Sequence, residues 1–438
     1  MQGITNGLLV LKLPLAKLPQ PNGAAMRILA VISAISLAGA ALADPPGAHW
    51  GRVPGLGADM IAATGTTTGL QTWIEGFRGR ALAQGVSAAV FDAAMNGLDY
   101  LPDVIKKDRN QNEFTKTIWD YLDTAVSDDR IASGQAALAK YADLLNRIEA
   151  AYGVDKEVVL AIWGLESAYG AVRGDTPSIQ ALATLAYDGR RAVFFEGELL
   201  AALQILQSGD VLAANMKGSW AGAMGHTQFM PTSYLALAVD FTGDGKRNIW
   251  NDDPSDALAS TAAYLAKYGW KKGNLWGIEV TLPAGFDYTL SGERVKKPVV
   301  DWQAMGIRTA FGADLPDHGA GSILLPGGAR GAAFLIFANF QVIEKYNTAD
   351  AYVIAVGHLA DRIKGRPAVS AIWPRDLRAL SFAERVELQQ RLLSKGFNPG
   401  GVDGKIGPLT IAAVKAFQTA SDLKPDGYPG LDILKGLR

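Results

Sequence analysis

The chain has 438 residues, of which 49% are hydrophobic and 19% are charged. Length and composition of this kind predict two or three compact domains and exclude an intrinsically disordered protein. The net charge of -1 argues against a nucleic-acid partner, and the absence of cysteine excludes disulfides, cysteine-ligated zinc and a lipid anchor on cysteine.

The N-terminal segment has the pattern of an export signal. Arg27 precedes an apolar run, residues 28–42, which ends in small residues before Asp44. A positive charge, a short apolar core and a small-x-small exit are typical of secretory signals, and the run is short for a membrane span. We therefore predict an N-terminal extension with a signal peptide over residues 1–43, and a periplasmic protein. Residues 44–69 are rich in Gly, Pro, Ala and Thr and are predicted to be a linker.

Helical patterns follow from residue 70 onwards, most clearly over residues 73–83, 88–96, 135–152 and 156–169. In the last of these, Ile162, Trp163 and Glu166 fall on one helical face. Apolar surroundings disfavour the charged form of a carboxyl group and keep it protonated, as a general acid requires. Glu166 is therefore the candidate catalytic acid. A glutamate at the edge of an amphipathic helix, held by an arginine or a backbone amide, is the structural alternative.

Residues 215–231 are punctuated by glycine and are predicted to be irregular. Glycines let backbone approach a ligand closely, and Ser219 and Gln228 offer neutral donors and acceptors that suit sugar hydroxyl and acetamido groups. A loop that packs helices together has the same composition, so both interpretations stay open. His226 is interpreted as an ordinary loop histidine rather than a base.

Residues 240–251 resemble the start of an EF-hand loop, with oxygen ligands at positions one, three and five and glycine at six. Position twelve is Asn251 instead of glutamate, so Asp256 in the next helix is expected to complete the site. The candidate ligands of a structural Ca²⁺ or Na⁺ are Asp240, Thr242, Asp244, Asn248 and Asp256. An Asp/Gly-rich turn without an ion is the alternative.

A helix is predicted over residues 254–268, and after it the spacing of apolar residues changes from a helical to an alternating pattern. Alternating apolar residues predict one β-hairpin over 278–290 and a second over 323–337. Helices are predicted again over 340–346 and 349–363, so the body is mainly α with a small inserted sheet. Asn339 and Tyr346 flank one of these helices and suit either a sugar-binding wall or polar caps.

A second linker is predicted over residues 366–376, followed by a compact module over 377–438. This module contains a weak internal repeat, in which a helix is followed by an Asp-Gly turn at Asp403 and again at Asp426.

Together these segments resemble the membrane-bound lytic transglycosylase B family, the lytic murein transglycosylases. The motifs that carry the resemblance are Trp163-Gly164-Leu165-Glu166-Ser167-x-Tyr169-Gly170, Ala181-Leu182-Ala183-Thr184-Leu185-Ala186, Arg190-Arg191-x-x-Phe194-Phe195, Gly222-Ala223-Met224-Gly225-x-x-Gln228-Phe229-Met230-Pro231, Asp240-Phe241-x-Gly243-Asp244-Gly245 and Asn339-Phe340-x-x-Ile343-x-x-Tyr346-Asn347. The last part resembles a small three-helix peptidoglycan-binding module through Leu388-Gln389-x-x-Leu392 and Asp403-Gly404-x-x-Gly407-Pro408-x-Thr410.

The resemblance implies a lysozyme-like catalytic domain over residues 70–365 and a three-helix domain over 377–438. It also implies that Glu166 is the sole acid and base. Glu166 would cleave the β-1,4 bond between N-acetylmuramic acid and N-acetylglucosamine without water, and the product would end in 1,6-anhydro-N-acetylmuramic acid. Catalysis would require no cofactor and no second carboxylate, in contrast to ordinary glycosidases.

By the same resemblance, neutral groups of Ser219, Gln228 and Tyr264 would orient the substrate's acetamido group. Arg190 and Arg191 would meet carboxylates of the peptide stem or the lactyl group, or else serve the structure. Phe194 stands where some relatives have a phenol, which puts one sugar contact in doubt. The expected partners are peptidoglycan strands and proteins of wall synthesis or division, and the expected state is a soluble monomer.

Two other functions fit parts of the sequence. A hydrolytic muramidase would need water and a second acid, for which Glu149, Asp175, Glu196 and Glu198 are available, though none has surroundings as apolar as those of Glu166. A non-catalytic scaffold that binds the cell wall would need neither.

Overall fold

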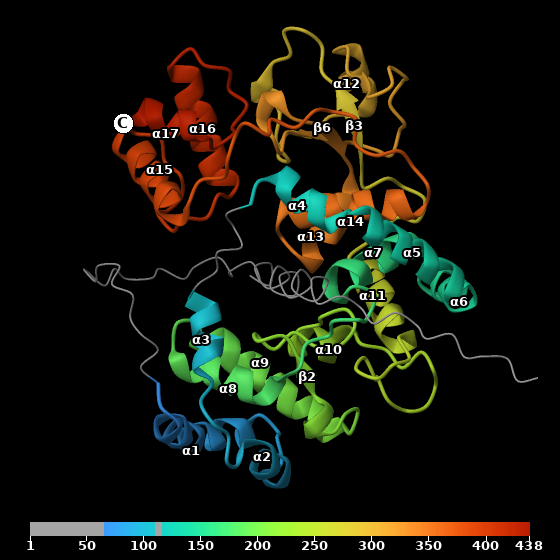
Figure 1. The fold of residues 1–438 in the computed structure, drawn as a ribbon, viewed down its shortest axis with the longest axis vertical. Coiled ribbons are helices and arrows are strands. Elements are labelled where there is room, and N and C mark those ends of the chain that lie inside the picture. Colours follow the sequence, from blue (N-terminus) through green and yellow to red (C-terminus); the bar gives the residue numbers. More distant parts are fainter. Residues whose placement is uncertain (1–64, 110–115) are drawn as a thin grey trace, which may run out of the picture.

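The structure is a computed structural model that describes residues 65–109 and 116–438 (Figure 1). The predicted export signal and most of the first predicted linker lie outside the described residues. The main body is helical, as predicted, and its longer helices are α1 (Thr67–Ala83), α2 (Ala88–Met95), α3 (Pro102–Arg109), α4 (Ile118–Ala125), α5 (Asp128–Lys140), α6 (Ala142–Tyr152), α7 (Lys156–Ser167), α8 (Ser178–Asp188), α9 (Ala192–Ser208), α10 (Pro231–Leu237), α11 (Ser255–Lys267), α13 (Ala338–Tyr346) and α14 (Asp350–Ile363).

Helix α7 lies at the centre of this body. All of its residues from Glu157 to Ser167 are buried, because α5, α11 and α14 pack around it. The helix ends where Ala168 and Tyr169 take φ values of 50° and 57°, in the left-handed region that residues with a Cβ rarely adopt. The Tyr169 hydroxyl donates to the Arg130 carbonyl at 2.9 Å, which holds this sharp turn directly after Glu166.

One predicted helix is wrong. The pattern over residues 135–152 predicts a continuous helix, but the chain breaks at Tyr141 between α5 and α6. The Tyr141 ring contacts the edge of the Trp163 ring, with centroids 5.6 Å apart. Packing against α7 therefore overrides the local helical pattern at this residue.

The inserted sheet is antiparallel, with strand order β4 (Arg308–Thr309), β3 (Gly277–Thr281), β6 (Ala333–Ile336), β5 (Ser322–Leu324). The predicted hairpin over 323–337 is confirmed, because Ile323 lies opposite Leu335 in the β5–β6 ladder. The hairpin predicted over 278–290 is wrong: β3 pairs with β4 and β6. Residues after Gly285 form a turn and a 3₁₀ helix capped by Asp287, while Phe286 enters the insert's own core.

Three carboxyl groups meet where the insert reaches the helical body. Oxygens of Glu293, Glu344 and Asp350 lie within 4.8 Å of one another. Burial, followed by the charge of Glu293, raises the pKa of Glu344 to about 7 and also raises the pKa of Asp350. A carboxyl group whose pKa is higher in the folded than in the unfolded protein favours folding below its unfolded pKa. This stability is lost as the pH rises through the folded pKa.

Replacing Glu344 by glutamine is therefore expected to stabilise the protein at pH 8 and to have little effect at pH 5. Removing one charge from the cluster should raise the free energy of unfolding at pH 8 by about 1 kcal/mol after allowance for solvent screening. This corresponds to a rise of roughly 2–4 °C in Tm. Thermal unfolding at both pH values measures this. Glu196→Gln is the matched control, because Glu196 is paired with Arg80 and should give no stabilisation. An equal rise at pH 5 and pH 8 for Glu344→Gln would contradict the prediction.

The C-terminal module is a three-helix unit, α15 (Phe382–Ser394), α16 (Pro408–Ala420) and α17 (Leu431–Leu437), with its own apolar core. Two buried glutamines explain its internal repeat. Gln389 Oε1 accepts from the backbone N–H of Asp403 and Gly404, at 3.0 and 2.7 Å. Gln418 Oε1 accepts from Gly427 N–H at 2.8 Å. Each Asp-Gly turn is thus held by a glutamine from the preceding helix.

The module lies beside the inserted sheet and contacts it directly (Figure 1). Lys415 Nζ donates to the Ser291 carbonyl at 2.5 Å, to Ser291 Oγ at 2.7 Å and to the Tyr288 carbonyl at 3.2 Å. Asp426 Oδ2 accepts from Ala329 N–H at 2.9 Å. We call these contacts of Lys415 and Asp426 the module clasp.

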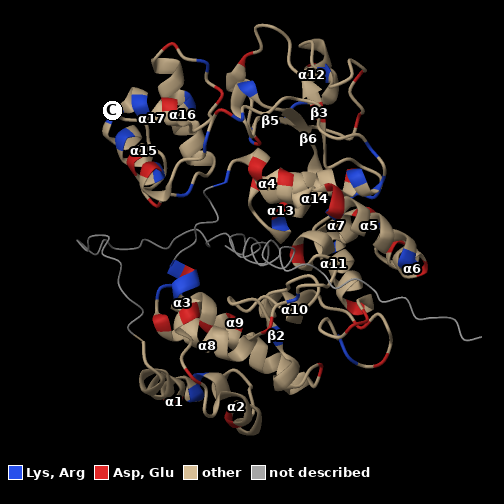
Figure 2. Ribbon diagram, viewed as in Figure 1, with Lys and Arg blue, Asp and Glu red and all other residues tan. Residues whose placement is uncertain are grey.

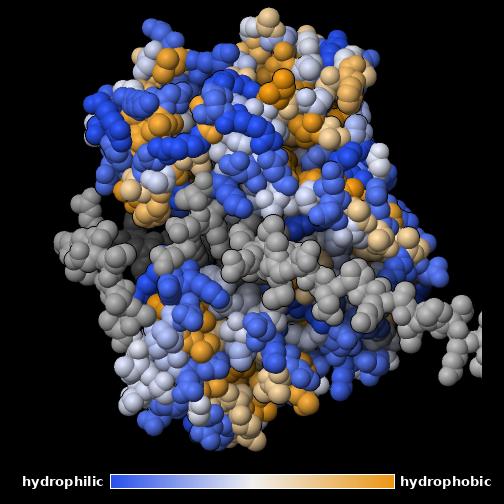
Figure 3. All heavy atoms as spheres, viewed as in Figure 1, coloured by the Kyte–Doolittle hydropathy of each residue, from blue (hydrophilic) through white to orange (hydrophobic). Residues whose placement is uncertain are grey.

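The surface is mixed in charge and polarity. Acidic and basic residues are interspersed along the chain in Figure 2. On the face seen in Figure 3, apolar residues are scattered among hydrophilic ones. Over residues 65–109 and 116–438, none of the helices combines the length and apolarity that crossing a bilayer requires.

Candidate active site

Glu166 lies in the last turn of α7 and is only 1% exposed. Helix α14 packs against α7 and brings the Tyr352 hydroxyl to Glu166 Oε1, where it donates a hydrogen bond of 2.6 Å. A hydrogen bond from a neutral hydroxyl fixes the orientation of the buried carboxyl group.

Three phenols surround this carboxyl group. Burial, and then the negative charge of Glu166, raise the pKa of Tyr121, Tyr346 and Tyr352 above the ordinary value for tyrosine. All three phenols are therefore protonated near neutral pH, and the hydroxyls of Tyr352 and Tyr346 donate to Glu166 Oε1 and to the Thr227 carbonyl. Sequence analysis missed Tyr121 and Tyr352, because α4 and α14 lie far from α7 in the chain and carry no local pattern that marks these residues.

The glycine-rich segment 215–231 packs against the end of α7 and is irregular, as predicted. Its backbone is pinned by short bridges between Gly218 and Met224 and between Met224 and Phe229. Gly218 belongs to β2 (Lys217–Gly218), which pairs with β1 (Thr176–Pro177). Added Cβ atoms at Gly222 and Gly225 would collide with Leu182 and the Ile249 carbonyl, so glycine is required at both positions.

Two predicted substrate-binding residues are held firmly by this segment. Ser219 Oγ accepts from Ala223 N–H at 3.1 Å. Gln228 has φ of 52°, and its Nε2 donates to the carbonyls of Arg173 and Gly225 at 3.0 and 2.8 Å. Gln228 Oε1 is buried and has no hydrogen-bond partner. A buried acceptor left unpaired costs about 1–3 kcal/mol, which suits an atom that meets a ligand's N–H.

Tyr264 and Tyr346, also predicted, lie together beside the same segment. Their ring centroids are 4.9 Å apart, and each contacts Phe229 edge to face. The Tyr346 hydroxyl donates to the Thr227 carbonyl at 2.6 Å, and the Tyr264 hydroxyl donates to the Lys345 carbonyl. The structure thus joins these two tyrosines to the segment that carries Gln228.

Three other predicted residues have structural partners. Asn339 Nδ2 donates to the carbonyls of Lys271 and Asn274, both at 2.9 Å. Arg190 and Arg191 both pair with the buried Asp108, at 2.6 Å each. A role of these three residues in binding substrate stays a prediction.

The acids considered for a hydrolytic mechanism lie in other surroundings. Glu196 pairs with Arg80, and Glu198 accepts from Thr232 N–H and Oγ1 at 2.9 and 2.7 Å. Glu149 lies 3.7 Å from Lys272, and Asp175 is exposed. Each is thus occupied by a partner or open to solvent, which does not favour a second catalytic acid.

The structure brings together the three carboxylates among the five predicted ligands of the EF-hand-like loop, and Thr242 Oγ1 donates to Asp240 Oδ1 at 3.2 Å. Oxygens of Asp240, Asp244 and Asp256 lie within 4.8 Å of one another. Backbone N–H groups hold these carboxylates in place. Asp240 accepts from the N–H groups of Gly243 and Gly245 at 2.7 and 2.8 Å. Asp256 accepts from those of Phe241, Thr242 and Asn248 at 2.9, 3.1 and 2.9 Å. Carboxylates on a tight glycine turn are the donor set that a hard cation prefers.

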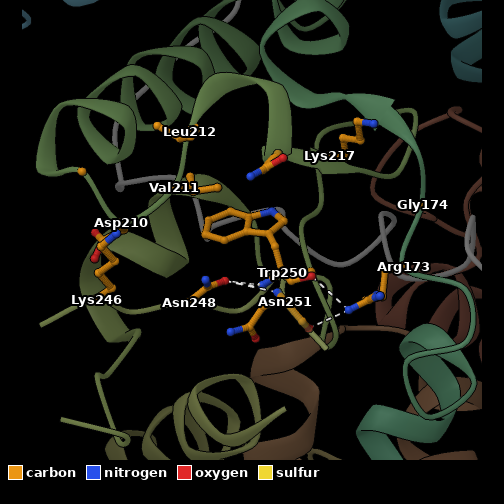
Figure 4. Close-up of a pocket in the computed structure, with 13 residues that line it drawn as sticks. Arg173, Gly174, Asp210, Val211, Leu212, Lys217, Lys246, Asn248, Trp250 and Asn251 are labelled. Carbon is orange, nitrogen blue, oxygen red and sulfur yellow. Dashed lines mark hydrogen bonds between the residues drawn. The ribbon is translucent and has the colours of Figure 1, made fainter. Parts of the chain in front are cut away.

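A cavity of about 420 Å³ lies beside this loop (Figure 4). Trp250 stands in its middle, with Arg173 at one side and Lys246 at the other. Neither Glu166 nor its tyrosines line it. The cavity is therefore distinct from the surroundings of Glu166.

The sequence and the fold of this chain are similar to those of known proteins. Residues 69–361 match the family model described as the transglycosylase SLT domain, and residues 383–437 match that of a putative peptidoglycan-binding domain. The chain is 36% identical over 250 residues to the membrane-bound lytic murein transglycosylase B of Escherichia coli K12. That match covers 56% of this chain and 66% of the relative, just under two thirds of its length.

Two solved structures are similar in fold and sequence. SltB3 of Pseudomonas aeruginosa, crystallised with NAG-anhNAM-pentapeptide, has 49% identity and a TM-score of 0.82, covering 84% of this chain and 99% of SltB3. The lytic transglycosylase Slt35 of Escherichia coli, in complex with calcium, has 31% identity and a TM-score of 0.58, covering 68% of this chain and 93% of Slt35. The chain belongs to the lytic transglycosylase B family of SLT-domain enzymes that act on peptidoglycan.

Proposed function

We propose that this protein is a lytic murein transglycosylase that cleaves the β-1,4 bond between N-acetylmuramic acid and N-acetylglucosamine and leaves 1,6-anhydro ends. The observation that carries the proposal is the buried Glu166, whose Oε1 accepts a hydrogen bond of 2.6 Å from the Tyr352 hydroxyl. Family membership, and the peptidoglycan fragment bound to SltB3, support the same substrate class.

One carboxyl group then performs both proton transfers. Protonated Glu166 gives its proton to the glycosidic oxygen as the bond to C1 breaks, and positive charge develops on the sugar. The resulting carboxylate takes the proton of the muramyl 6-hydroxyl as this oxygen bonds to C1. Glu166 regains its proton, and no water is consumed. Tyr352 remains a donor throughout, because its own proton is held tightly.

Gln228 gives a reason for the choice of sugar. Its Oε1 is a buried acceptor without a partner, while its Nε2 is fixed by two backbone carbonyls. An acetamido N–H of the substrate would donate a hydrogen bond to Oε1. A sugar with a hydroxyl in place of the acetamido group would bring its donor less close to Oε1. Ser219, Tyr264 and Tyr346 line the same segment and are proposed to complete the sugar contacts.

The product distinguishes this reaction from hydrolysis. Purified murein sacculi are digested and the soluble muropeptides are weighed by mass spectrometry. The proposal expects ends lighter than hydrolysed ends by one water molecule. Hydrolysed ends would identify a muramidase, and unchanged sacculi would leave only a role in wall binding.

The cellular setting follows from the substrate. The C-terminal module is proposed to bind the wall, and the export signal predicted over residues 1–43 is proposed to deliver the protein to the periplasm. Partners in wall synthesis or division, and a monomeric state, remain predictions from the sequence.

A calcium ion is proposed for the EF-hand-like loop, where Asp240, Asp244 and Asp256 would supply carboxylate oxygens. Such an ion would fix the backbone of the loop, and the chemistry at Glu166 does not pass through it. The calcium complex of Slt35 supports this choice over Na⁺.

Adding Ca²⁺ to metal-free protein is expected to raise Tm, and EDTA is expected to reverse the rise. A ligand at one hundred times its Kd stabilises the folded state by about 2.7 kcal/mol. Thermal unfolding with Ca²⁺ or with Na⁺ at equal ionic strength measures the effect and separates the two ions. Asp240→Asn should abolish the rise, whereas Glu344→Gln, in the cluster with Glu293 and Asp350, should retain it. A Ca²⁺ response that survives Asp240→Asn would place the ion elsewhere.

A further inference from the structure

His226 lies between α7, which carries Glu166, and the last residue of the EF-hand-like loop, Asn251. It is 3% exposed, although it belongs to a glycine-rich loop. On one side Trp163 Nε1 donates to His226 Nδ1 at 3.1 Å, and on the other side His226 Nε2 lies 2.7 Å from the Asn251 carbonyl. The imidazole thus bridges α7 and residue 251.

These two partners fix the tautomer of the ring. The indole N–H of Trp163 can only donate, so Nδ1 must be the bare nitrogen. The Asn251 carbonyl can only accept, so Nε2 must carry the hydrogen. A neutral ring with hydrogen on Nε2 satisfies both bonds. Arg173 Nη1, which lies 3.3 Å from Nε2, then donates to the closer carbonyls of Trp250 and Asn251.

Two further contacts bind His226 to the turn that follows Glu166. Ser167 Oγ donates to the His226 carbonyl at 2.5 Å and accepts from Gly170 N–H at 3.0 Å. A Cβ atom on Gly170 would lie 2.6 Å from His226 Nδ1, so the ring packs directly on this glycine. His226 therefore holds the chain on both sides of Glu166: at Trp163, one turn before it, and at Ser167, directly after it.

The far end of the bridge is itself anchored. Arg173 Nη1 donates to the carbonyls of Trp250 and Asn251 at 2.9 and 2.6 Å (Figure 4). Its Nη2 pairs with Asp252 at 2.8 Å. The Asn251 carbonyl is consequently a fixed acceptor, and the imidazole that reaches it has a fixed orientation.

We propose that His226 is a positioning residue for Glu166, which holds the last turn of α7 through Trp163 and Ser167 against the Asn251 carbonyl. This inference rests on the proposed transglycosylase function. Displacing a catalytic group by about 1 Å costs on the order of a hundredfold in rate, so loss of this bridge lowers kcat more than it changes KM.

The electrostatics of the site agree with a neutral ring. Burial lowers the pKa of His226 to about 4, and the charge of Arg173 acts in the same direction. The Asn251 carbonyl and the charges of Asp252 and Asp253 oppose the shift. The neutral form that the two hydrogen bonds demand is thus the form present at neutral pH.

The test compares three variants in full-length protein. His226→Leu removes both side-chain bonds and is expected to lower kcat on a defined muropeptide about 10- to 100-fold, with KM within about twofold. His226→Asn keeps an acceptor where Nδ1 stood, and should restore kcat to within about threefold of wild type. His318→Leu, at a partly buried histidine of the insert, is the matched control and should change neither constant.

Spectroscopy measures the bridge itself. In ¹⁵N-labelled protein the Trp163 indole N–H resonance, assigned through Trp163→Phe, is expected downfield in wild type and His226→Asn, and shifted upfield in His226→Leu. The ¹³C resonance of the Glu166 carboxyl should move in His226→Leu only. These signals do not depend on activity, so they still test positioning if the protein proves not to cleave murein.

Three results would overturn the inference. The first is a folded His226→Leu protein with wild-type kcat and an unmoved Glu166 carboxyl resonance. The second is an equal loss of kcat in His226→Leu and His226→Asn when both are folded. If neither variant folds, Trp163→Phe removes the hydrogen bond between Trp163 Nε1 and His226 Nδ1 while leaving His226 in place. The third result is a wild-type kcat in Trp163→Phe.

Discussion

Glu166→Gln is expected to abolish the release of 1,6-anhydro muropeptides, with kcat/KM falling at least about 10³-fold. General acid catalysis contributes about 10²- to 10⁴-fold, and here one side chain supplies both the acid and the base. Glutamine has nearly the same volume and can still accept the hydrogen bond from the Tyr352 hydroxyl. The fold should therefore survive, with Tm close to that of wild type. Loss of turbidity of purified sacculi and the mass of the soluble products measure the effect.

Glu198→Gln is the control for this substitution. Glu198 is also a buried acid, at 3% exposure, but it accepts from Thr232 on α10 rather than facing the tyrosines around Glu166. Its replacement should lower stability and leave the anhydro product in place. If lysis persisted in Glu166→Gln and disappeared in Glu198→Gln, then Glu198 would be the catalytic acid and Glu166 a structural one.

Tyr352→Phe is expected to lower kcat about 10- to 100-fold, which corresponds to roughly 1.4–2.7 kcal/mol of the activation barrier. The change removes the hydroxyl that donates to Glu166 Oε1 at 2.6 Å. Without it the carboxylate formed after the first proton transfer loses a buried donor, and hydrogen bonds to charged groups are the stronger ones. Steady-state kinetics on a defined muropeptide measure the loss.

Tyr234→Phe provides the comparison for Tyr352→Phe. The Tyr234 hydroxyl is also buried and donates to a backbone carbonyl, that of Arg247, away from Glu166. Both variants should lose some stability, but only Tyr352→Phe should lose rate. Equal kinetic losses in the two variants would show that the effect comes from packing instead of the contact with Glu166.

The parts of the site that lie close together in sequence were predictable. Glu166 could be singled out as a candidate because the acid and its apolar neighbours occupy a single helix, α7. Gln228 and Ser219 could be singled out because glycine and neutral polar residues are interspersed within one short segment. Local patterns of this kind reflect local structure, so the sequence is sufficient to interpret them.

Tyr352 and Tyr121 could not be found in this way. Tyr352 reaches Glu166 from 186 residues further along the chain, and only the packing of α14 on α7 brings them together. The same limit explains the hairpin predicted over 278–290. Its apolar alternation is real, but Phe286 alternates because it enters the core of the insert, while β3 takes its partners from distant strands.

His226 shows a different limit. A histidine on a glycine-rich loop resembles a solvent-exposed residue when only its neighbours are considered. Its burial comes from Trp163 on one side and the Asn251 carbonyl on the other, which lie 63 residues before it and 25 residues after it. Composition of the segment carries no information about either contact.

The module clasp has a consequence for the enzyme at work on a wall. Lys415 donates hydrogen bonds to carbonyl and hydroxyl oxygens, and the charges of Asp426 and Asp287 add an attraction that salt would screen. In concentrated brine the hydrogen bonds of the clasp should persist, while the attraction between these charges should weaken. If the module binds the wall as proposed, the clasp would keep a fixed distance between the bound stretch of wall and the bond that Glu166 is proposed to cleave.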